Sequence, residues 1–301
     1  MEIKKKLLIT GATSYIGKHL IKKLLSLGTY EITALVRKSS NFEILTNESR
    51  YIDFHIFESN YESIQSLFKK KKIDCVYHLA SLTTLFHSES QISTMIDSNI
   101  KLGTFLLEAA KNYGCKNFIN TGTYWQNYEV INRPNSFYAA TKSSFEIILD
   151  YYCFAYNLSS ITLKLCDVYG YDDHRNKLVS NLINDEVCLD HYDLTKGDQK
   201  IYFVYIDDVI SAFIKALTLL EASEEYYKKH LVFGVFANQK HSLKEFVNIL
   251  EKEKGKKFKI KWGKKKYNEF QIMNPIIEEK LINWEAKVPL KKGIQLILNK
   301  A

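Results

Sequence analysis

The sequence predicts an α/β fold with a doubly wound parallel sheet, followed by a smaller C-terminal lobe. Short apolar runs alternate with segments of helical apolar periodicity as far as Leu165, a pattern typical of βαβ units. A glycine-containing turn joins the first apolar run to the first helical segment. After Gly170 the sequence is less regular. We therefore predict a sheet domain at residues 1–168 and a discontinuous lobe at 169–301, with some strands near 200–236 returning to the sheet.

The elements of the sheet domain follow from periodicity and from residues that end helices. Apolar residues recur at helical spacing from Ile16 to Leu25, and Gly28 ends that helix. Runs rich in β-branched and apolar residues predict strands. The strands predicted before Gly170 are 5–10, 31–36, 51–57, 73–79, 117–120 and 160–165, and the helices are 15–27, 64–70, 95–113 and 137–156.

The later elements are shorter and more widely spaced. Residues 171–177 are polar and predict a loop, and Ser242 is a favourable N-cap for the helix that follows it. The final stretch is rich in lysine, and we assign no element to it. The helices predicted after Gly170 are 179–187, 207–220 and 242–252, and the strands are 188–192, 201–205 and 231–236.

Composition excludes several classes of protein. The chain has 301 residues, of which 46% are hydrophobic and 25% charged, so it is globular rather than disordered. No apolar stretch reaches the ~18 residues of a membrane span, and the apolar run near the N-terminus is too short for a secretory signal. The five cysteines have no metal-ligand spacing. We expect a cytoplasmic protein with no membrane partner, no disulfide framework and no metal.

The net charge of +8 raises the question of a nucleic-acid partner. Only four of the 42 basic residues are arginines, which phosphate- and base-reading surfaces favour. These arginines are Arg37, Arg50, Arg133 and Arg175. The other basic residues are lysines spread along the chain, which is typical of a solvated surface. We therefore expect no nucleic-acid partner.

Residues 10–17 join the first strand to the first helix and predict a phosphate-binding loop. Glycine permits a tight turn at the start of this loop and close packing of helix on strand at its end. The N–H groups at the start of the helix then face an anion. An ordinary βα turn is the alternative. The candidate cofactor-binding residues of the loop are Gly11, Thr13, Ser14, Tyr15, Ile16 and Gly17.

The end of the second strand indicates which dinucleotide is bound. An acidic residue at this position normally holds a free ribose 2′-hydroxyl, and this strand end carries none. Arg37 and Lys38 can instead pair with a 2′-phosphate, and the two serines that follow can donate to it. The alternative for Arg37 is a solvated strand end. We predict NADPH as the cofactor and regard NAD as less favoured.

Tyr138 and Lys142 lie four residues apart at the start of a predicted helix and share one face. A free tyrosine has a pKa of ~10. A nearby lysine ammonium stabilises tyrosinate and lowers that pKa, so that Tyr138 becomes an acid or base near neutral pH. A solvated i,i+4 pair is the alternative. The position after the fifth strand of a dinucleotide-binding fold favours the catalytic interpretation.

With these motifs, the chain resembles the extended short-chain dehydrogenase/reductase family, whose Rossmann sheet is joined to a substrate-binding lobe. The resemblance includes residues 11–17, 78–80, 99–104, 138–142, 168–170 and 204–209. It implies that Thr123 hydrogen-bonds the substrate oxygen, Tyr138 exchanges the proton and Lys142 holds the nicotinamide ribose. It also implies cofactor contacts at Leu79, Ala80, Ser81, Asn99, Thr121 and Leu165. We interpret His78 as a packed strand-end histidine rather than a catalyst.

Tyr124 and Trp125 distinguish among the reactions of this family. Sugar 4,6-dehydratases carry Asp-Glu after the catalytic threonine, and these carboxyl groups serve as acid and base in water elimination. Aromatic side chains cannot replace them, so we do not expect a 4,6-dehydratase. A 4-epimerase must retain its nicotinamide. A reductase only needs to transfer hydride in one direction from a cofactor that exchanges. The basic strand end at Arg37 suits NADPH as that cofactor.

Residues 120–127 and 163–178 resemble the CDP-abequose and CDP-paratose synthase group of 4-ketoreductases. Asp167 and Tyr171 depart from the asparagine and proline that are usual in the wider family. The resemblance implies reduction at C4 of a nucleotide-linked, CDP-linked 4-keto-6-deoxy sugar in surface-polysaccharide biosynthesis. The candidate substrate-binding residues are Thr83, Thr123, Tyr124, Trp125, Asp167, Arg175 and Lys177, with the last two at the diphosphate. A solvated basic loop is the alternative for those two, and a core position is the alternative for the two aromatic residues.

Two other functions stay open. One is an NAD(P)-dependent nucleotide-sugar 4-epimerase, and the other is a non-catalytic nucleotide-sensing or RNA-binding relative of the fold. Non-catalytic relatives commonly lose the tyrosine or the lysine, and both are present here. In this family the helices predicted at 95–113 and 137–156 commonly form a four-helix dimer interface, so we expect a homodimer.

Overall fold

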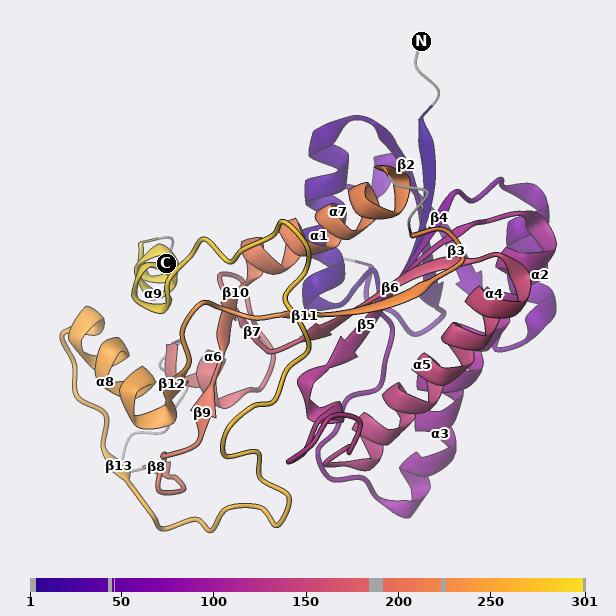
Figure 1. Ribbon diagram of the computed structural model, residues 1–301. Helices are drawn as coiled ribbons and strands as arrows, with labels where there is room; N and C mark the ends of the chain where they lie inside the picture. Colours follow the sequence, from indigo (N-terminus) through magenta and orange to yellow (C-terminus); the bar gives the residue numbers. More distant parts are fainter. Residues whose placement is uncertain (1–3, 43–44, 46, 184–191, 223–225, 300–301) are drawn as a thin grey trace.

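The structure, a computed structural model, describes residues 4–42, 45, 47–183, 192–222 and 226–299. Its main sheet has seven strands in the order β11-β6-β5-β4-β1-β2-β3, and every neighbouring pair is parallel. Helices cover both faces of this sheet (Figure 1). The prediction of a doubly wound parallel α/β sheet is therefore confirmed. The strands are β1 (Lys5–Thr10), β2 (Tyr30–Arg37), β3 (Ile52–Phe57), β4 (Cys75–His78), β5 (Asn117–Thr123), β6 (Ser159–Leu165) and β11 (His230–Val235).

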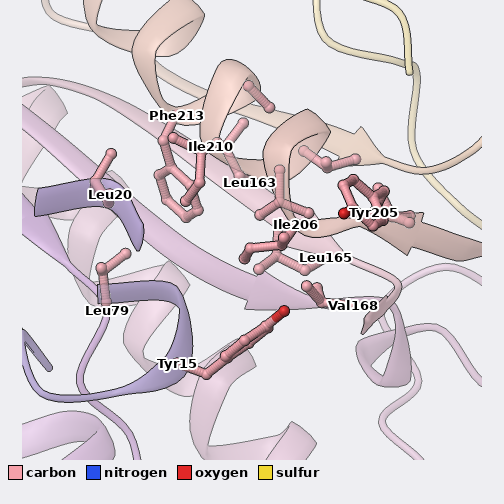
Figure 2. Close-up of a cluster of buried hydrophobic side chains, with 14 of the residues drawn as sticks. Tyr15, Leu20, Leu79, Leu163, Leu165, Val168, Tyr205, Ile206, Ile210 and Phe213 are labelled. Atoms are coloured by element: carbon pink, nitrogen blue, oxygen red, sulfur yellow. The ribbon is translucent and has the colours of Figure 1, made fainter. Parts of the chain in front are cut away.

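Each face of the sheet has its own apolar core. In β1, Leu7 and Ile9 belong to one core and Leu8 to the other, because successive side chains of a strand point to opposite faces. Figure 2 shows part of the first core, in which Leu20 of α1 and Phe213 of α7 gather over the sheet. Helices α1 (Tyr15–Leu27) and α7 (Ile206–Ala222) cover this face, and α2 (Tyr61–Lys70), α4 (Leu102–Tyr113) and α5 (Phe137–Tyr156) cover the other.

Some boundaries differ from the predicted ones. Helix α2 begins three residues earlier than predicted, because Asn60 Oδ1 accepts a hydrogen bond from Ser63 N at 2.9 Å and caps the helix there. Strand β5 continues to Thr123, which is level with Leu165 of β6. The helix predicted at 95–113 consists of α3 (Ile92–Ile96), a π-helical segment (Asp97–Lys101) and α4.

The C-terminal part of the chain adds three small two-stranded sheets. These are β7 (Asp167–Tyr169) with β10 (Phe203–Tyr205), β9 (Lys200–Ile201) with β12 (His241–Ser242), and β8 (Tyr192–Asp193) with β13 (Ile260–Lys261). Of the strands near 200–236, β11 lies in the main sheet beside β6, whereas β9 and β10 pair outside it. The division of the chain at residue 168 stays a prediction.

Three helices accompany these strands: α6 (Leu178–Ile183), α8 (Leu243–Lys254) and α9 (Leu290–Leu298). Ser242 caps α8 as predicted, accepting a hydrogen bond from Glu245 N at 3.1 Å. Helix α9 was not predicted, although Leu290 and Ile294 bury an apolar face in the core. Part of the predicted helix 179–187 and most of the predicted strand 188–192 lie outside the described residues.

Two structural features bear on partners and metals. Within the described part of the chain, no helix is both long and apolar enough to cross a membrane. Among the same residues, no group of three or more histidine, cysteine and acidic side chains is arranged to hold a metal ion.

Candidate active site at the carboxyl edge of the sheet

A cavity of about 1080 Å³ lies at the carboxyl ends of the sheet strands. This edge is where ligands bind in open α/β sheets. Loops after β1, β4, β5 and β6 form one side, and residues 199–203 and 268–272 form the other. The predicted site residues that line it are Ser14, Tyr15, Ile16, Leu79, Ser81, Thr83, Thr121, Thr123, Tyr124, Trp125, Tyr138, Leu165, Asp167, Arg175 and Lys177. The predicted residues that do not line it are Gly11, Thr13, Gly17, Arg37, Lys38, Ala80, Asn99 and Lys142.

The loop between β1 and α1 has the geometry of a phosphate-binding loop. Gly11 has φ of +65°, and a Cβ there would lie 2.9 Å from the backbone nitrogen of Ala80. A Cβ on Gly17 would lie 2.1 Å from the carbonyl oxygen of Gly11, so only glycine fits at either position. Ser14 caps α1, accepting from Gly17 N at 3.1 Å. The first turn of α1 therefore opens on the cavity with free N–H groups, which suits a diphosphate.

Arg37 and Lys38, the two basic residues at the end of β2, do not line the cavity. Arg37 and Lys38 are both exposed, and the Arg37 N–H donates to Ser40 Oγ at 3.0 Å within a turn. Arg37 lies two residues beyond Leu35, which is level with Thr10 at the end of β1. The two cations thus lie at the strand end next to the phosphate-binding loop.

The end of β4 is held to β1 through Thr10. Its Oγ1 accepts from Ala80 N at 3.0 Å and lies 3.0 Å from Nδ1 of His78. His78 is fully buried, and burial lowers its pKa to about 3. It is a neutral, packed histidine, as we interpreted it from the sequence.

Asn99 holds the segment after β4 in place. Its side chain accepts from Leu82 N at 2.7 Å, and it donates to Leu82 O at 3.1 Å and to Thr141 Oγ1 at 2.9 Å. Asn99 is fully buried and does not line the cavity. It therefore braces Ser81 and Thr83 against α5, a contact that its predicted role at the cofactor did not include.

Tyr138 lies in the cavity wall and is 7% exposed. Burial raises its pKa above the ordinary value of 10, while hydrogen bonds with Thr83 and Ser81 act in the opposite direction. The prediction that Lys142 lowers the pKa of Tyr138 is therefore wrong. The loss of solvation outweighs the hydrogen bonds with Thr83 and Ser81, and Tyr138 holds its proton at neutral pH.

Lys142 lies one helical turn beyond Tyr138 and is 1% exposed. Its Nζ has no hydrogen-bond partner among the described residues. Burial lowers its pKa to about 8, and the charge of Glu146 acts against that change. A buried ammonium without a partner is costly, so this position fits a ligand that supplies hydroxyl oxygens, as a dinucleotide ribose does.

Thr123 ends β5 with its hydroxyl proton available. Its Oγ1 accepts from Trp125 N at 3.3 Å, and its N–H donates to Gln126 Oε1 at 2.9 Å. The ring of Trp125 meets Tyr138 edge to face at 6.1 Å between centroids. Thr123, Trp125 and Tyr138 thus surround one part of the cavity, where a hydroxyl, a phenol and an indole face the same space.

The side of the cavity formed after β6 carries an acid and two cations. Tyr124 donates its hydroxyl proton to Asp167 Oδ2 at 2.8 Å. Burial raises the pKa of Asp167, and the charge of Lys177 opposes this change. Burial and then the charge of Arg175 lower the pKa of Lys177. Lys177 is thus a cation in the cavity wall with Asp167 as its acidic neighbour.

Arg175 already has an acidic partner. Its Nε and Nη2 donate to the two carboxylate oxygens of Asp173 at 2.6 and 2.7 Å, and Nη2 also donates to Val168 O at 2.9 Å. The guanidinium carbon lies 4.2 Å from the centre of the Tyr15 ring. Asp173 was not among the residues predicted from the sequence. Because the Asp173 carboxylate neutralises Arg175, Lys177 is the cation better able to bind an anionic ligand.

Other lining residues were also missed. Residues 268–272 line the cavity from far along the chain, as does Gln199, which is 8% exposed and has its Oε1 without a partner among the described residues. Asn135 Nδ2 donates to Phe270 O at 3.5 Å, linking the two walls. No local motif marks these residues, and only the fold brings them to the strand ends.

Comparisons with known proteins agree with this geometry. A family model described as "NAD dependent epimerase/dehydratase family" matches residues 7–230. A protein described as CDP-abequose synthase from Salmonella muenchen is 28% identical over 303 residues, covering 99% of each chain. One of the same description from Yersinia pseudotuberculosis is 28% identical over 295 residues, covering 96% of this chain and 98% of the other. The solved UDP-glucose 4-epimerase of Thermotoga maritima shares the fold, with a TM-score of 0.82, 23% identity and coverage of 98% of this chain and 97% of the other.

Proposed function

This chain belongs to the NAD dependent epimerase/dehydratase family, and we propose that it is the NADPH-dependent reductase of a nucleotide-linked 4-keto sugar. It is an NAD(P)-dependent oxidoreductase that acts on nucleotide sugars. The finer proposal is that the sugar is a CDP-linked 4-keto-6-deoxy sugar and that the product carries a hydroxyl at C4. The observation that carries it is the cavity at the carboxyl edge of the sheet, whose wall includes both Tyr138 and Thr123.

The residues present fit a dinucleotide. The loop of Gly11, Ser14 and Gly17 at the start of α1 would hold its diphosphate, and Lys142 would hold a ribose. Arg37 and Lys38 would pair with a 2′-phosphate, which supports NADPH. When bound, the reduced nicotinamide supplies the hydride for the keto carbon.

The side chains around the keto oxygen complete the reduction. Thr123 donates a hydrogen bond to that oxygen, and Tyr138 donates its phenolic proton as negative charge develops there. Burial raises the pKa of Tyr138, so its phenol carries the proton at neutral pH. Lys142, on the same helix as Tyr138, would hold the dinucleotide ribose during this step.

Elimination of water has no support at this site. The two residues after Thr123 are Tyr124 and Trp125, and neither side chain can serve as a carboxylate acid or base. The carboxylate that does line the cavity after β6, Asp167, accepts the hydroxyl proton of Tyr124. We therefore propose keto reduction rather than dehydration.

The substrate proposal rests on the relatives and on the cations of the cavity. Two relatives that align along almost the whole chain are described as CDP-abequose synthases, which supports a CDP-linked sugar. Lys177, assisted by Arg175, would lie at the diphosphate of that nucleotide. The indole of Trp125 would contact the sugar near Tyr138.

A 4-epimerase is the second candidate, since a solved 4-epimerase shares the fold and Tyr138 with Lys142 serves both reactions. The two candidates differ in how the dinucleotide is held. An epimerase keeps it bound through the catalytic cycle, whereas a reductase exchanges it at each turnover.

We also propose a homodimer formed through α5. Ile147, Tyr151 and Phe154 are 72%, 53% and 85% exposed on this helix. Large apolar side chains that are this exposed on one helix are typical of a subunit interface.

The test is to supply the purified protein with NADPH and a CDP-linked 4-keto-3,6-dideoxyhexose. We expect oxidation of NADPH in proportion to product, with the product hydroxyl at C4 shown by NMR. The matched control replaces the CDP-linked sugar with its UDP-linked counterpart. The proposal fails if no keto sugar nucleotide is reduced, or if the protein carries a tightly bound NAD that does not exchange and interconverts C4 epimers instead.

A further inference from the structure

Lys18 is a buried lysine near the start of α1, next to the phosphate-binding loop. A positive charge there opposes the dipole of the helix, whose first N–H groups face the cavity. Lys18 is 8% exposed, and it is not part of the cavity wall. A buried cation thus lies beside the cavity without lining it, and its partner must lie elsewhere in the fold.

The partner of Lys18 is Asp172, which follows β7. Lys18 Nζ donates to Asp172 Oδ2 at 2.6 Å and to the backbone oxygen of the same residue at 2.9 Å. The other carboxylate oxygen of Asp172 lies 2.9 Å from Nε2 of His174, whose side chain is exposed. Lys18 is therefore the buried partner of Asp172, and it holds both the side chain and the main chain of that residue.

The backbone of Asp172 has a conformation that few residues with a side chain adopt. Its φ is +58°, in the left-handed region. Two groups of α1 hold the chain at this point, because Lys18 contacts Asp172 and the Tyr15 hydroxyl donates to Tyr171 O at 3.1 Å. The loop of residues 171–177 is therefore fixed to α1 where it begins.

The same loop carries the two cations of the cavity wall, and one of them rests on α1. The Arg175 guanidinium carbon lies 4.2 Å from the centre of the Tyr15 ring, and Nη2 donates to Val168 O at 2.9 Å. Figure 2 shows the Tyr15 side chain pointing from α1 toward Val168. The N–H of Lys177 donates to Arg175 O at 2.7 Å, and both cations line the cavity. Direct contacts and one short loop thus connect Lys18 to Lys177.

A histidine fills the space between α1 and the loop. The ring of His19 meets the rings of Tyr15 and Tyr171 edge to face, at 4.9 and 4.8 Å between centroids. Burial lowers the pKa of His19 to about 4, so the ring is neutral at pH 7 and carries no charge. Among the described residues, the ion pair that joins α1 to the loop is that of Lys18 with Asp172.

We propose that Lys18 is a positioning residue for the anion-binding side of the cavity: by holding Asp172 against α1, it places Lys177 and Arg175 at the diphosphate of the sugar nucleotide. The proposal rests on the proposed function only in assigning that diphosphate to the two cations. It gives α1 two tasks, since its first N–H groups face one ligand while Lys18 and Tyr15 hold the loop that binds the other. Loss of Lys18 should therefore weaken sugar-nucleotide binding and leave dinucleotide binding unchanged.

The first variant is Lys18→Met, which keeps an apolar stem and removes the charge. The probe is CDP, measured by calorimetry with NADPH at saturation so that CDP does not occupy the dinucleotide site. We expect affinity for CDP to fall about tenfold and affinity for NADPH, measured separately, to stay within about twofold. Lys22→Met is the matched control and should change neither affinity, because Lys22 is one turn further along α1, is 44% exposed and lies 3.9 Å from Glu48.

Asp172→Asn tests whether Lys18 acts through the loop. Asparagine tolerates the left-handed conformation and keeps the backbone oxygen that Lys18 also contacts. We expect about a threefold loss of CDP affinity, and a loss in Lys18→Met/Asp172→Asn no greater than in Lys18→Met alone. The side chain of Asp172 is 43% exposed, so this variant carries the test if Lys18→Met does not fold.

Hydrogen exchange measures the loop without any ligand. The amides of residues 171–177 should exchange about tenfold faster in Lys18→Met and also faster in Asp172→Asn, because the loop opens more often once the ion pair is lost. The amides of α7, which covers the same face of the sheet as α1, should exchange at the unchanged rate. A general loss of stability would instead accelerate exchange in both places.

Four results would overturn the proposal: unchanged CDP affinity in Lys18→Met, an equal loss of NADPH affinity in that variant, losses that multiply in the double variant, or unchanged exchange of the loop. Failure of the proposed function has a different signature. If CDP does not bind the unchanged protein, the substrate assignment fails, and faster exchange confined to residues 171–177 still supports the role of Lys18 in holding the loop.

Discussion

Tyr138 combines a cavity position with a pKa that burial raises. Its phenol is therefore a proton donor at neutral pH and a poor base, in keeping with reduction. Tyr138→Phe keeps the ring and its packing but removes the proton. We expect kcat to fall by about 100-fold or more.

The control for Tyr138→Phe is a measurement of NADPH binding. The dissociation constant for NADPH, measured by fluorescence titration, should stay within about twofold because the phenyl ring is retained. Equal losses in kcat and in NADPH affinity would mean that Tyr138 holds the cofactor rather than the proton.

The proposed role of Lys142 at the ribose predicts that cofactor binding depends on pH. The pKa of Lys142 is lowered to about 8, so the ammonium that we propose binds the ribose is present below that pH and is lost above it. The dissociation constant for NADPH should be constant from pH 6 to 7.5 and then rise by up to about tenfold per pH unit. In Lys142→Met, affinity should be weaker and independent of pH over this range. A matching rise in that variant would assign the titration to another group.

A substitution of Arg37 tests whether the protein prefers NADPH over NADH. It is exposed at the end of β2, so its replacement should leave the fold unchanged. Arg37→Ala should weaken NADPH binding about tenfold and leave NADH binding within about twofold, because only NADPH carries the 2′-phosphate. Lys23→Ala, an exposed basic residue of α1, is the control. Equal losses for the two dinucleotides would refute the role of Arg37 at the 2′-phosphate.

For single residues, the sequence predicted which side chains belong to the site but not their environment. The spacing of Tyr138 and Lys142 identified both side chains, but the sign of the Tyr138 pKa change depends on burial, which spacing does not give. Arg175 was identified as a cation near the nucleotide, but its bidentate pair with Asp173 follows from how the loop folds.

At the scale of elements, helix α5 carries Tyr138 and Lys142, the two proposed catalytic side chains, and an exposed apolar surface farther along. Its bounds, Phe137–Tyr156, are those predicted, because Ser136 caps it and its apolar pattern is long. Helix α9 was missed because lysines and a glycine interrupt its short apolar pattern. Gly293 lies there because a Cβ would come within 2.1 Å of the Tyr169 hydroxyl.

The exposed face of α5 makes a prediction about assembly. Phe154 is 85% exposed, so Phe154→Glu should not disturb the folded subunit but should place a charge in the proposed interface. Sedimentation should show a dimer for the unchanged protein and a monomer for this variant. Tyr51→Glu, an exposed aromatic residue at the end of the sheet near β3, is the control and should remain dimeric. A Phe154→Glu protein that is still dimeric would place the interface elsewhere.

At the scale of the whole molecule, the sheet was predictable and the far wall of the cavity was not. Strands and helices of the sheet domain have local periodicity, and parallel strands bring their carboxyl ends to one edge. The far wall includes Gln199 and residues 268–272, which have no periodic pattern and reach the cavity only through tertiary contacts. The roles of the predicted site residues stay predictions until the variants above are measured.

The position of β11 has a consequence for biosynthesis. It is the edge strand beside β6, yet 64 residues separate the end of β6 at Leu165 from the start of β11 at His230. While the chain emerges from a ribosome, β6 therefore presents an open row of amide and carbonyl groups until residue 235 has been made. The nascent polypeptide passes through a stage in which most of its sheet is complete but the backbone groups along one edge are unpaired and can bind the strands of other chains. Delay or premature termination of translation within that interval would favour aggregation over folding.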